Sequence, residues 1–199
     1  MKKTFTQAMI DRRSNYTISN ASPVSRDRIE EIIRTAVKYM PTSFNCQSSR
    51  VVLLYGEKHA RLWHIVMETL RRLVPAGRFG RTAKKIEGFA AGYGTICYFD
   101  ETAITADFME KFPTYRDNFP IWAQQANGML QFAVWSMLEE EGLGVNLQHY
   151  NPLIDDEVKK TFQLPDSWQL IAQMPFGVPT AGPLPKTFAP PEERIRILG

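Results

Sequence analysis

The 199-residue sequence has few of the residues that build disulfide-rich or metal-binding proteins. Cysteine occurs at Cys46 and Cys97, which is too few for a disulfide framework or a cysteine-based metal site. The three histidines, His59, His64 and His149, are scattered and show no metal-ligand spacing such as HExxH. We therefore expect no metal site and a reduced, cytoplasmic protein.

The sequence also lacks long apolar runs and blocks of one charge. No stretch is long and apolar enough to span a membrane, and no apolar run follows the N-terminal lysines, so we expect neither a signal peptide nor a membrane partner. The formal net charge is +3 and the pI is about 8.9, with basic residues interspersed among acidic ones. Because nucleic-acid binding requires a basic face or stripe, we expect no nucleic-acid partner.

What is present is typical of a folded protein, with 44% hydrophobic and 23% charged residues. The length fits one domain over residues 1–199. Helical and extended patterns are interleaved, but the strands are few and several have no crossover helix between them. This order favours an α+β fold, with a central, mostly antiparallel sheet flanked by helices, over a doubly wound sheet.

Hydrophobic spacing and turn residues predict the individual elements. Helices are expected near residues 5–14, 25–40, 62–73, 106–111, 122–141 and 155–162. Strands are expected at 51–55, 95–99, 145–147, 168–174 and 194–198. The continuous apolar run 51–55 indicates a strand buried on both faces, and Pro175 and Gly177 are expected to end strand 168–174. His59 and His64 are expected at or near the surface.

The segment from Pro41 to Arg50 links a strongly periodic helix to the apolar strand 51–55. Proline ends the helix, because it cannot donate the next backbone hydrogen bond. Asn45 and Gln47 are two residues apart, so an extended segment would place both amides on one face, where they match the donors and acceptors of a flat heterocycle. The alternative is an ordinary polar loop, because turn residues cluster in loops for local reasons.

Two further segments each allow a functional and a structural interpretation. Arg12, Arg13 and Ser14 close the first helix, where guanidinium groups and a hydroxyl suit a phosphate. The alternative is a solvated basic helix end, which the helix dipole favours. The aromatic segment 108–119 is either a lid over a pocket or packed surface.

The longest predicted helix, 122–141, is apolar over a surface too wide for one sheet face to cover. A homodimer explains this width, because such interfaces resemble a core cut in two. The proline-rich tail 178–191 carries Lys186 and precedes the alternating run 194–198. An extended arm of this kind can cross to a partner subunit.

Together these residues resemble the nitroreductase family of FMN-dependent oxidoreductases. The markers are Arg12-Arg13-Ser14, the run from Pro41 to Gln47, and Lys186, spread over nearly the whole chain. The short length and the runs 88–95 and 146–152 resemble one subgroup. That subgroup includes the copper-induced bacterial nitroreductases and the yeast fatty-acid-repression regulator.

The resemblance implies an intertwined homodimer with an extended C-terminal arm and two FMN sites at the interface, each lined by both subunits. The cofactor-binding residues that it implies are, at the phosphate and ribityl chain, Arg12, Arg13, Ser14 and Lys186; from the partner subunit, Pro41, Ser43, Asn45 and Gln47; and along the flavin, Leu147, Gln148 and His149. It assigns no catalytic side chain, because the flavin supplies the chemistry. Tyr16 and Phe188 stand where many relatives have cations, so a lower flavin potential is expected.

The implied reaction is ping-pong. NADH or NADPH delivers hydride to FMN and leaves, and a small-molecule acceptor such as a nitroaromatic or a quinone then takes the electrons, with the aromatic segment 108–119 as the candidate for stacking on it. Two other classes stay open. One is a flavin-binding regulatory protein with slow turnover in a lipid or stress response. The other is a mildly basic nucleic-acid-binding dimer that uses Arg12, Arg13, Arg71, Arg72 and Arg78, and the lack of a recognisable binding motif counts against it.

Overall fold

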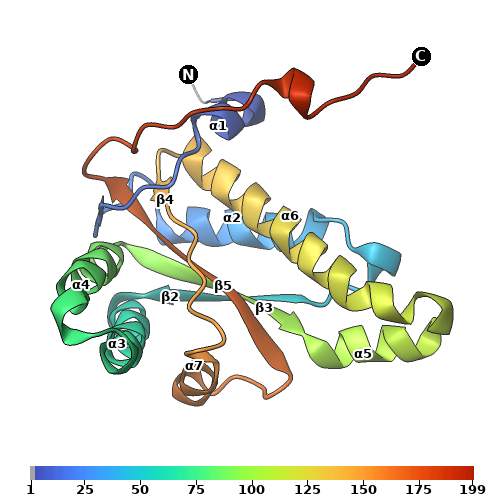
Figure 1. Ribbon diagram of the computed structural model, residues 1–199, viewed down its shortest axis with the longest axis horizontal. Coiled ribbons are helices and arrows are strands. Elements are labelled where there is room, and N and C mark those ends of the chain that lie inside the picture. The colour runs from blue at the N-terminus through green and yellow to red at the C-terminus, as the bar shows by residue number, and fades with distance from the viewer. Residues whose placement is uncertain (1–2) are drawn as a thin grey trace.

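The protein is an antiparallel sheet with helices on both faces, described for residues 3–199 by a computed structural model (Figure 1). The strands are β1 Ile18–Ser19, β2 Ser49–Tyr55, β3 Gly94–Glu101, β4 Gly144–Val145 and β5 Trp168–Pro179. Over residues 3–199 they form one five-stranded sheet in the order β1-β5-β3-β2, with β4 also paired to β5. The ladders between these strands are antiparallel, which confirms the predicted α+β class.

The helices begin and end largely where caps and breakers place them. They are α1 Phe5–Asp11, α2 Arg26–Tyr39, α3 Gly56–Leu73, α4 Ala76–Ala90, α5 Thr102–Lys111, α6 Phe119–Glu140 and α7 Asp155–Phe162, with the 3-10 helices η1 Ser43–Asn45, η2 Pro113–Asn118 and η3 Pro191–Glu193. Thr4 and Ser25 cap α1 and α2 through their side-chain oxygens. In the described part of the chain, no helix is long and apolar enough to cross a membrane.

Strand β3 separates two hydrophobic cores, because successive side chains of a strand point to opposite faces. Ile96 and Tyr98 pack into the core that contains residues of α2 and α6. Cys97 and Phe99 pack into the core that contains residues of α3, α4 and α7. Figure 1 shows α2 and α6 on one side of the sheet and α3, α4 and α7 on the other.

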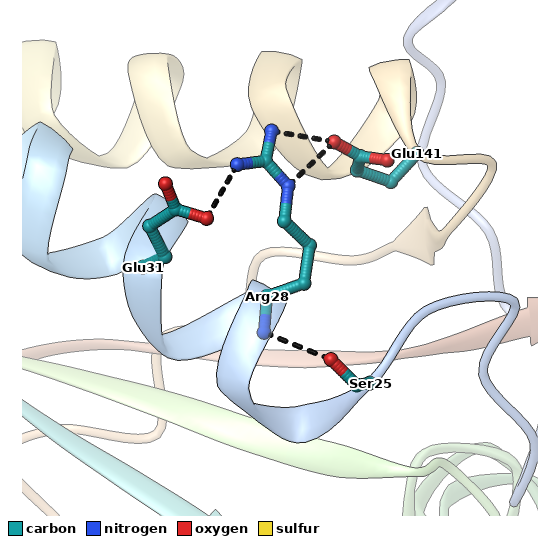
Figure 2. Close-up of polar contacts among 4 residues, drawn as sticks. All are labelled: Ser25, Arg28, Glu31 and Glu141. Atoms are coloured by element: carbon teal, nitrogen blue, oxygen red, sulfur yellow. Dashed lines mark hydrogen bonds and ion pairs between the residues drawn. The ribbon is translucent and has the colours of Figure 1, made fainter.

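An ion pair ties the beginning of α2 to the end of α6 (Figure 2). Arg28 donates from Nε and Nη2 to Oε1 of Glu141, at 2.9 and 2.7 Å, and from Nη1 to Glu31 at 2.7 Å. The Glu141 side chain is only 13% exposed, so this charge-assisted contact is partly shielded from water. The contact helps to fix the direction of α6, along which the candidate site lies.

Two elements on the α3–α4 side differ from the sequence prediction. The pattern does not predict α4, because Gly77 and Gly80 resemble helix breakers. Burial of Ile86 and Phe89 on one face of α4 outweighs that cost. The predicted burial of strand 51–55 on both faces is wrong, because β2 is the edge of the sheet and most of its residues are half-buried.

Two segments near the C-terminus differ from the sequence prediction within one chain. Strand β5 does not end at Pro175, because Pro175 pairs with Thr95 and Gly177 pairs with Gly144. The predicted strand 194–198 has no neighbouring strand in one chain, and residues 195–199 have no regular structure. Residues 179–199 are exposed throughout, and Figure 1 shows this segment passing α1 and ending away from the sheet.

His59 is 3% exposed, in contrast to its expected surface position, and belongs to a buried hydrogen-bonded chain. Its Nε2 lies 3.0 Å from the carbonyl oxygen of Ala90, so Nε2 carries the proton and donates. Its Nδ1 then accepts from the Thr95 hydroxyl at 2.8 Å, and Thr95 Oγ1 accepts from Trp63 Nε1 at 2.9 Å. The polar groups of the His59, Thr95 and Trp63 side chains therefore each have a hydrogen-bond partner.

This arrangement predicts that the protein loses stability in mild acid. Burial lowers the pKa of the His59 imidazole below its ordinary 6.5, so the unfolded chain binds a proton more readily than the folded chain. The contribution of neutral His59 is therefore complete above about pH 6.5 and falls as the pH drops from there towards the folded pKa. Urea unfolding at about pH 7.5, 6.5 and 5.5 measures this loss. His64→Gln, a change at an exposed position of α3, should keep the same pH dependence, and a flat profile in the parent protein would contradict the assignment.

Candidate functional site

Three cations from the two ends of the chain meet in one hollow of about 300 Å³. Arg12 and Arg13 come from the end of α1, and Lys186 comes from the segment after β5. The other lining residues are Ser14, Tyr16, Leu184 and Pro185. We call this hollow the cation pocket. It brings together the four residues that the family resemblance implies at a phosphate and its ribityl chain.

Backbone and amide contacts hold the wall of the cation pocket in place. Asn15 donates its backbone N–H to Val145 of β4 at 2.9 Å and its side-chain amide to the carbonyl of Arg13 at 2.9 Å. Asn146 donates to the carbonyl of Asn15 at 3.1 Å. Arg13 donates to the carbonyl of Leu184, which ties α1 to the C-terminal segment. The position of the pocket therefore depends on β4 and the segment after β5 as well as on α1.

The electrostatics of the cation pocket favour an anion. The Arg12 guanidinium lies 4.4 Å from the centre of the Trp135 ring on α6, and its Nε is buried with no hydrogen-bond partner among residues 3–199. Burial, and after it the charge of Arg13, lowers the pKa of Arg12. Within the same residues, Arg12, Arg13 and Lys186 form no ion pair. Lys186 instead lies 4.9 Å from the ring of Phe188.

The loop Pro41–Gln47 has a different conformation from the one expected. It is not extended, because η1 occupies its middle and Phe44, Asn45 and Gln47 have left-handed φ angles of 53°, 53° and 52°. Thr42 stabilises this shape: its carbonyl accepts from the N–H of Asn45 at 2.9 Å, and its Oγ1 accepts from the N–H of Gln47 at 3.0 Å. Such angles are unfavourable for residues other than glycine, so the tertiary structure must hold the loop.

The aromatic segment 108–119 contributes most of the contacts that stabilise the conformation of the loop Pro41–Gln47. The ring of Phe44 packs against four rings of the segment and of α6, with centroid distances of 4.6 to 6.0 Å; these rings are Phe112, Tyr115, Phe119 and Trp122. Phe108 also packs against Phe112 and Phe119. The structural interpretation of this segment, as packed surface, thus accounts for its aromatic residues within one chain. Asn45 and Gln47 stay exposed beside it.

The cation pocket and the loop Pro41–Gln47 lie at opposite ends of α6. Phe44 packs against Trp122 near the beginning of the helix, and Arg12 lies over Trp135 near its end. Those 13 residues correspond to about 20 Å along a helix axis. Figure 1 shows α1 near one end of α6 and the connection from α2 to β2 near the other. One chain therefore does not bring all the predicted site residues together.

Leu147, Gln148 and His149 begin just past the cation pocket, because they follow β4, which pairs with Ser14. Gln148 and Gln173 of β5 exchange both backbone hydrogen bonds at 2.8 Å, which holds this segment along the sheet. Leu147 packs against the core, whereas His149 is exposed and lines a second hollow, of about 460 Å³, under α6.

Sequence reasoning missed the residues that support the site. The side-chain amides of Asn15 and Asn146 donate hydrogen bonds to backbone carbonyls, and no sequence motif predicts such contacts. The hollow beside His149 is lined by Gln124, Gly128 and Gln131 of α6. The one feature of the sequence that could have indicated this hollow is Gly128, a glycine inside a predicted helix. In the part of the chain that is described, no three His, Cys, Asp or Glu side chains cluster as metal ligands.

Comparison with known proteins assigns the family. A model of the nitroreductase family matches residues 9–178. In Saccharomyces cerevisiae, the putative nitroreductase HBN1 is 33% identical over 187 residues, or 93% of each chain, and nitroreductase FRM2 is 31% identical over 186 residues, or 92% of each chain. The structure of nitroreductase CinD from Lactococcus lactis in complex with chloramphenicol has a TM-score of 0.89 and 37% identity, covering 98% of this chain and 100% of CinD. The fold, the matched length and these identities agree with the family that the sequence markers resemble, and the chain belongs to the nitroreductase family of oxidoreductases.

Proposed function

We propose that this oxidoreductase is an FMN-dependent NAD(P)H oxidoreductase whose FMN phosphate binds in the cation pocket. The convergence of Arg12, Arg13 and Lys186 on one hollow without an ion pair carries this proposal. Cations gathered without a counter-ion repel one another, and a phosphate offers them charge-assisted, bidentate partners. When bound, FMN supplies the redox chemistry, which is hydride from NADH or NADPH followed by electrons to an acceptor in a ping-pong sequence.

The protein's own residues bind and orient the cofactor. Arg12 and Lys186 neutralise the phosphate, while Arg13 and Ser14 hold the phosphate and the ribityl chain. The buried, unpartnered Nε of Arg12 is a donor that such an anion could satisfy. Leu147, Gln148 and His149 line the flavin from a segment that β5 holds in place. We assign no protein acid or base, so the catalytic contribution of these residues is position and electrostatics.

A homodimer would complete the site, because Pro41, Ser43, Asn45 and Gln47 lie about 20 Å from the cation pocket along α6. One observation supports a second copy. Phe5 and Met9 of α1 and Met129 and Phe132 of α6 are 38–48% exposed, and Phe5 packs edge-on against Phe132 at 6.2 Å. Exposed apolar side chains gathered in this way mark an interaction site. The loop from one subunit would then meet the pocket of the other.

The C-terminal arm would strengthen this dimer by crossing to the partner. Ile195 and Ile197 are 62% and 90% exposed and lie two residues apart, so an extended chain places both on one side. Beside the open edge strand β2 runs a groove of about 540 Å³, whose lining is both apolar (Ile33, Val37, Val51, Leu53 and Tyr55) and polar (Glu30, Arg34, Ser49 and Arg50). An unpaired edge beside a partly apolar groove is a suitable place for an added strand.

We further propose that the acceptor is a small nitroaromatic or a quinone. Relatives support the nitroaromatic part, because CinD has been solved in complex with chloramphenicol and with 4-nitrophenol at 36–37% identity to this chain. Both compounds carry a nitro group on an aromatic ring.

The test is the visible spectrum of the purified protein, recorded without oxygen before and after NADH or NADPH is added. We expect a yellow protein that bleaches with the donor and recovers its colour with 4-nitrophenol or a quinone. A yellow protein that resists both donors would favour a flavin-binding regulatory protein. A colourless protein that also fails to bind added FMN would refute the proposal.

A further inference from the structure

Residues 69–86, from the end of α3 to near the end of α4, contain six cations and no acidic residue. The cations are Arg71, Arg72, Arg78, Arg81, Lys84 and Lys85. The whole chain has 24 basic and 21 acidic residues, so in the rest of the chain the acidic residues outnumber the basic ones. The positive net charge of the protein therefore resides in this segment, which we call the basic surface.

Folding gathers these cations, which neutral residues separate in the sequence. Arg78, Arg81 and Lys85 recur at helical spacing, so they share one side of α4, and all three are exposed. The end of α3 lies beside the beginning of α4, because the Arg71 guanidinium lies 4.7 Å from the centre of the Phe79 ring. Within residues 3–199, Arg71 is the one cation of the six that forms an ion pair. Such a concentration of unpaired positive charge attracts an anionic partner.

Apolar groups lie at the tip of the basic surface, where α3 ends and α4 begins. Leu73 is 58% exposed and is followed closely by Pro75 and Ala76, which are also exposed. Beside this tip is a hollow of about 560 Å³ lined by Val74, Gly77, Arg78, Gly80, Arg81 and Thr82. A Cβ at Gly77 or Gly80 would meet no heavy atom within 4 Å, so the missing side chains leave this hollow open beside two arginines.

The basic surface lies away from the parts of the molecule to which the proposed function assigns a role. Helices α3 and α4 cover the face of the sheet opposite to α2 and α6 (Figure 1). The apolar side chains proposed for association lie on α1 and α6, and the groove proposed for the partner's arm lies between α2 and β2. A further partner can therefore reach the basic surface in the proposed dimer.

We propose that the basic surface binds an anionic lipid membrane, with Leu73 entering the headgroup layer and the arginines contacting lipid phosphates. Guanidinium groups bind phosphates bidentately, and long arginine side chains cover apolar surface while their charges stay in water. A nucleic acid fits this surface less well, because its single aromatic residue, Phe79, is half-buried beside Arg71 and offers no free ring for base stacking. A peripheral contact needs no membrane-spanning segment, so this inference departs from the sequence expectation of no membrane partner. It goes beyond the proposed function and does not depend on bound FMN.

The test is co-sedimentation of the full-length protein with vesicles of phosphatidylcholine that contain about 30% phosphatidylserine, at an ionic strength of about 0.1 M. We expect the parent protein to bind these vesicles and to stay in solution with vesicles of phosphatidylcholine alone. Arg78→Gln combined with Arg81→Gln should weaken binding about 10- to 30-fold, because two attractions to the anionic surface are lost while glutamine preserves the helix. Leu73→Gln, which keeps every charge, should weaken binding about 3- to 10-fold.

Lys58→Gln combined with Lys160→Gln is the matched control for the loss of two charges. Both lysines are exposed, and neither forms an ion pair within residues 3–199. They belong to α3 and α7, which pack on the same side of the sheet as the basic surface. Lys58 precedes Arg71 by 13 residues, or about 20 Å of helix, which exceeds the Debye length of about 10 Å. This variant should bind the vesicles within about twofold of the parent.

A parent protein that stays in solution with the anionic vesicles would overturn the proposal. Equal weakening by the two double variants would do the same, because it would show a general effect of net charge. Unchanged binding by Leu73→Gln would remove the role of the apolar tip and with it the membrane. Tighter binding of the parent to a DNA duplex than to the vesicles, at equal phosphate concentration, would assign the basic surface to a nucleic acid instead.

Discussion

Replacing Thr95 by valine is expected to lower the free energy of unfolding by about 2–6 kcal/mol. The two side chains have nearly the same shape, so the change opens no cavity, but it removes the hydroxyl that joins Trp63 to His59. Both the indole N–H and the imidazole Nδ1 would then be buried without a partner, at about 1–3 kcal/mol each. Urea unfolding of both proteins at one protein concentration, followed by tryptophan fluorescence, measures the difference.

Thr69→Val is the matched control for this change. Thr69 of α3 is 8% exposed, but its hydroxyl accepts only a long contact, 3.4 Å, from Arg72 at the surface. Because Arg72 can turn to water, this substitution should cost less than about 1 kcal/mol. Equal losses for the two variants would show that the buried chain contributes nothing beyond the burial of a threonine.

The sequence predicts those elements that are specified by neighbouring residues, such as a helix with a capping residue and a periodic apolar face. Helix α2 has a cap at Ser25 and a periodic apolar face. The antiparallel class is predicted correctly but for a reason that the structure does not bear out, because at least one helix stands between every two consecutive strands of residues 3–199. Helix α4 is different, because the burial of Ile86 and Phe89 overcomes its glycines and only the tertiary structure reveals that burial. His59 likewise appears polar and exposable until Thr95 and Ala90, both distant in the sequence, supply its partners.

The chemistry of the candidate site is easier to predict than its geometry. Residue type indicates that Arg12 and Arg13 suit a phosphate, the family resemblance adds Lys186, and the structure brings the three together. Spacing alone suggests an extended segment for Asn45 and Gln47, but the rings around Phe44 impose left-handed backbone angles that no local rule favours. The separation of about 20 Å along α6 is also set by the tertiary structure, and it is the reason why we propose a site built from two subunits.

A chain that ends at Ala189 is expected to be monomeric and to bind FMN about 100-fold more weakly than the full-length protein. It keeps Lys186 and the cation pocket but loses the run 194–198 that we place in the partner's β2 groove. Without a second subunit, the amides of Asn45 and Gln47 cannot reach the flavin. The loss of two hydrogen bonds at about 1–1.5 kcal/mol each corresponds to a factor of about 100. Light scattering and quenching of FMN fluorescence measure the two effects separately.

Two full-length variants distinguish the apolar side of the arm from its charged side. Ile195→Ser combined with Ile197→Ser should reproduce the truncation, because serine buries far less apolar surface against Ile33, Val37 and Leu53 and carries no charge that could pair with Arg34 or Arg50 of the same groove. Arg194→Ser combined with Arg196→Ser keeps both isoleucines and should leave the dimer and its FMN affinity nearly unchanged.

If the chain that ends at Ala189 stays dimeric, α1 and α6 suffice for association and the arm has another role. If it becomes monomeric but binds FMN normally, one chain holds the cofactor alone, and the loop Pro41–Gln47 does not contribute to the affinity.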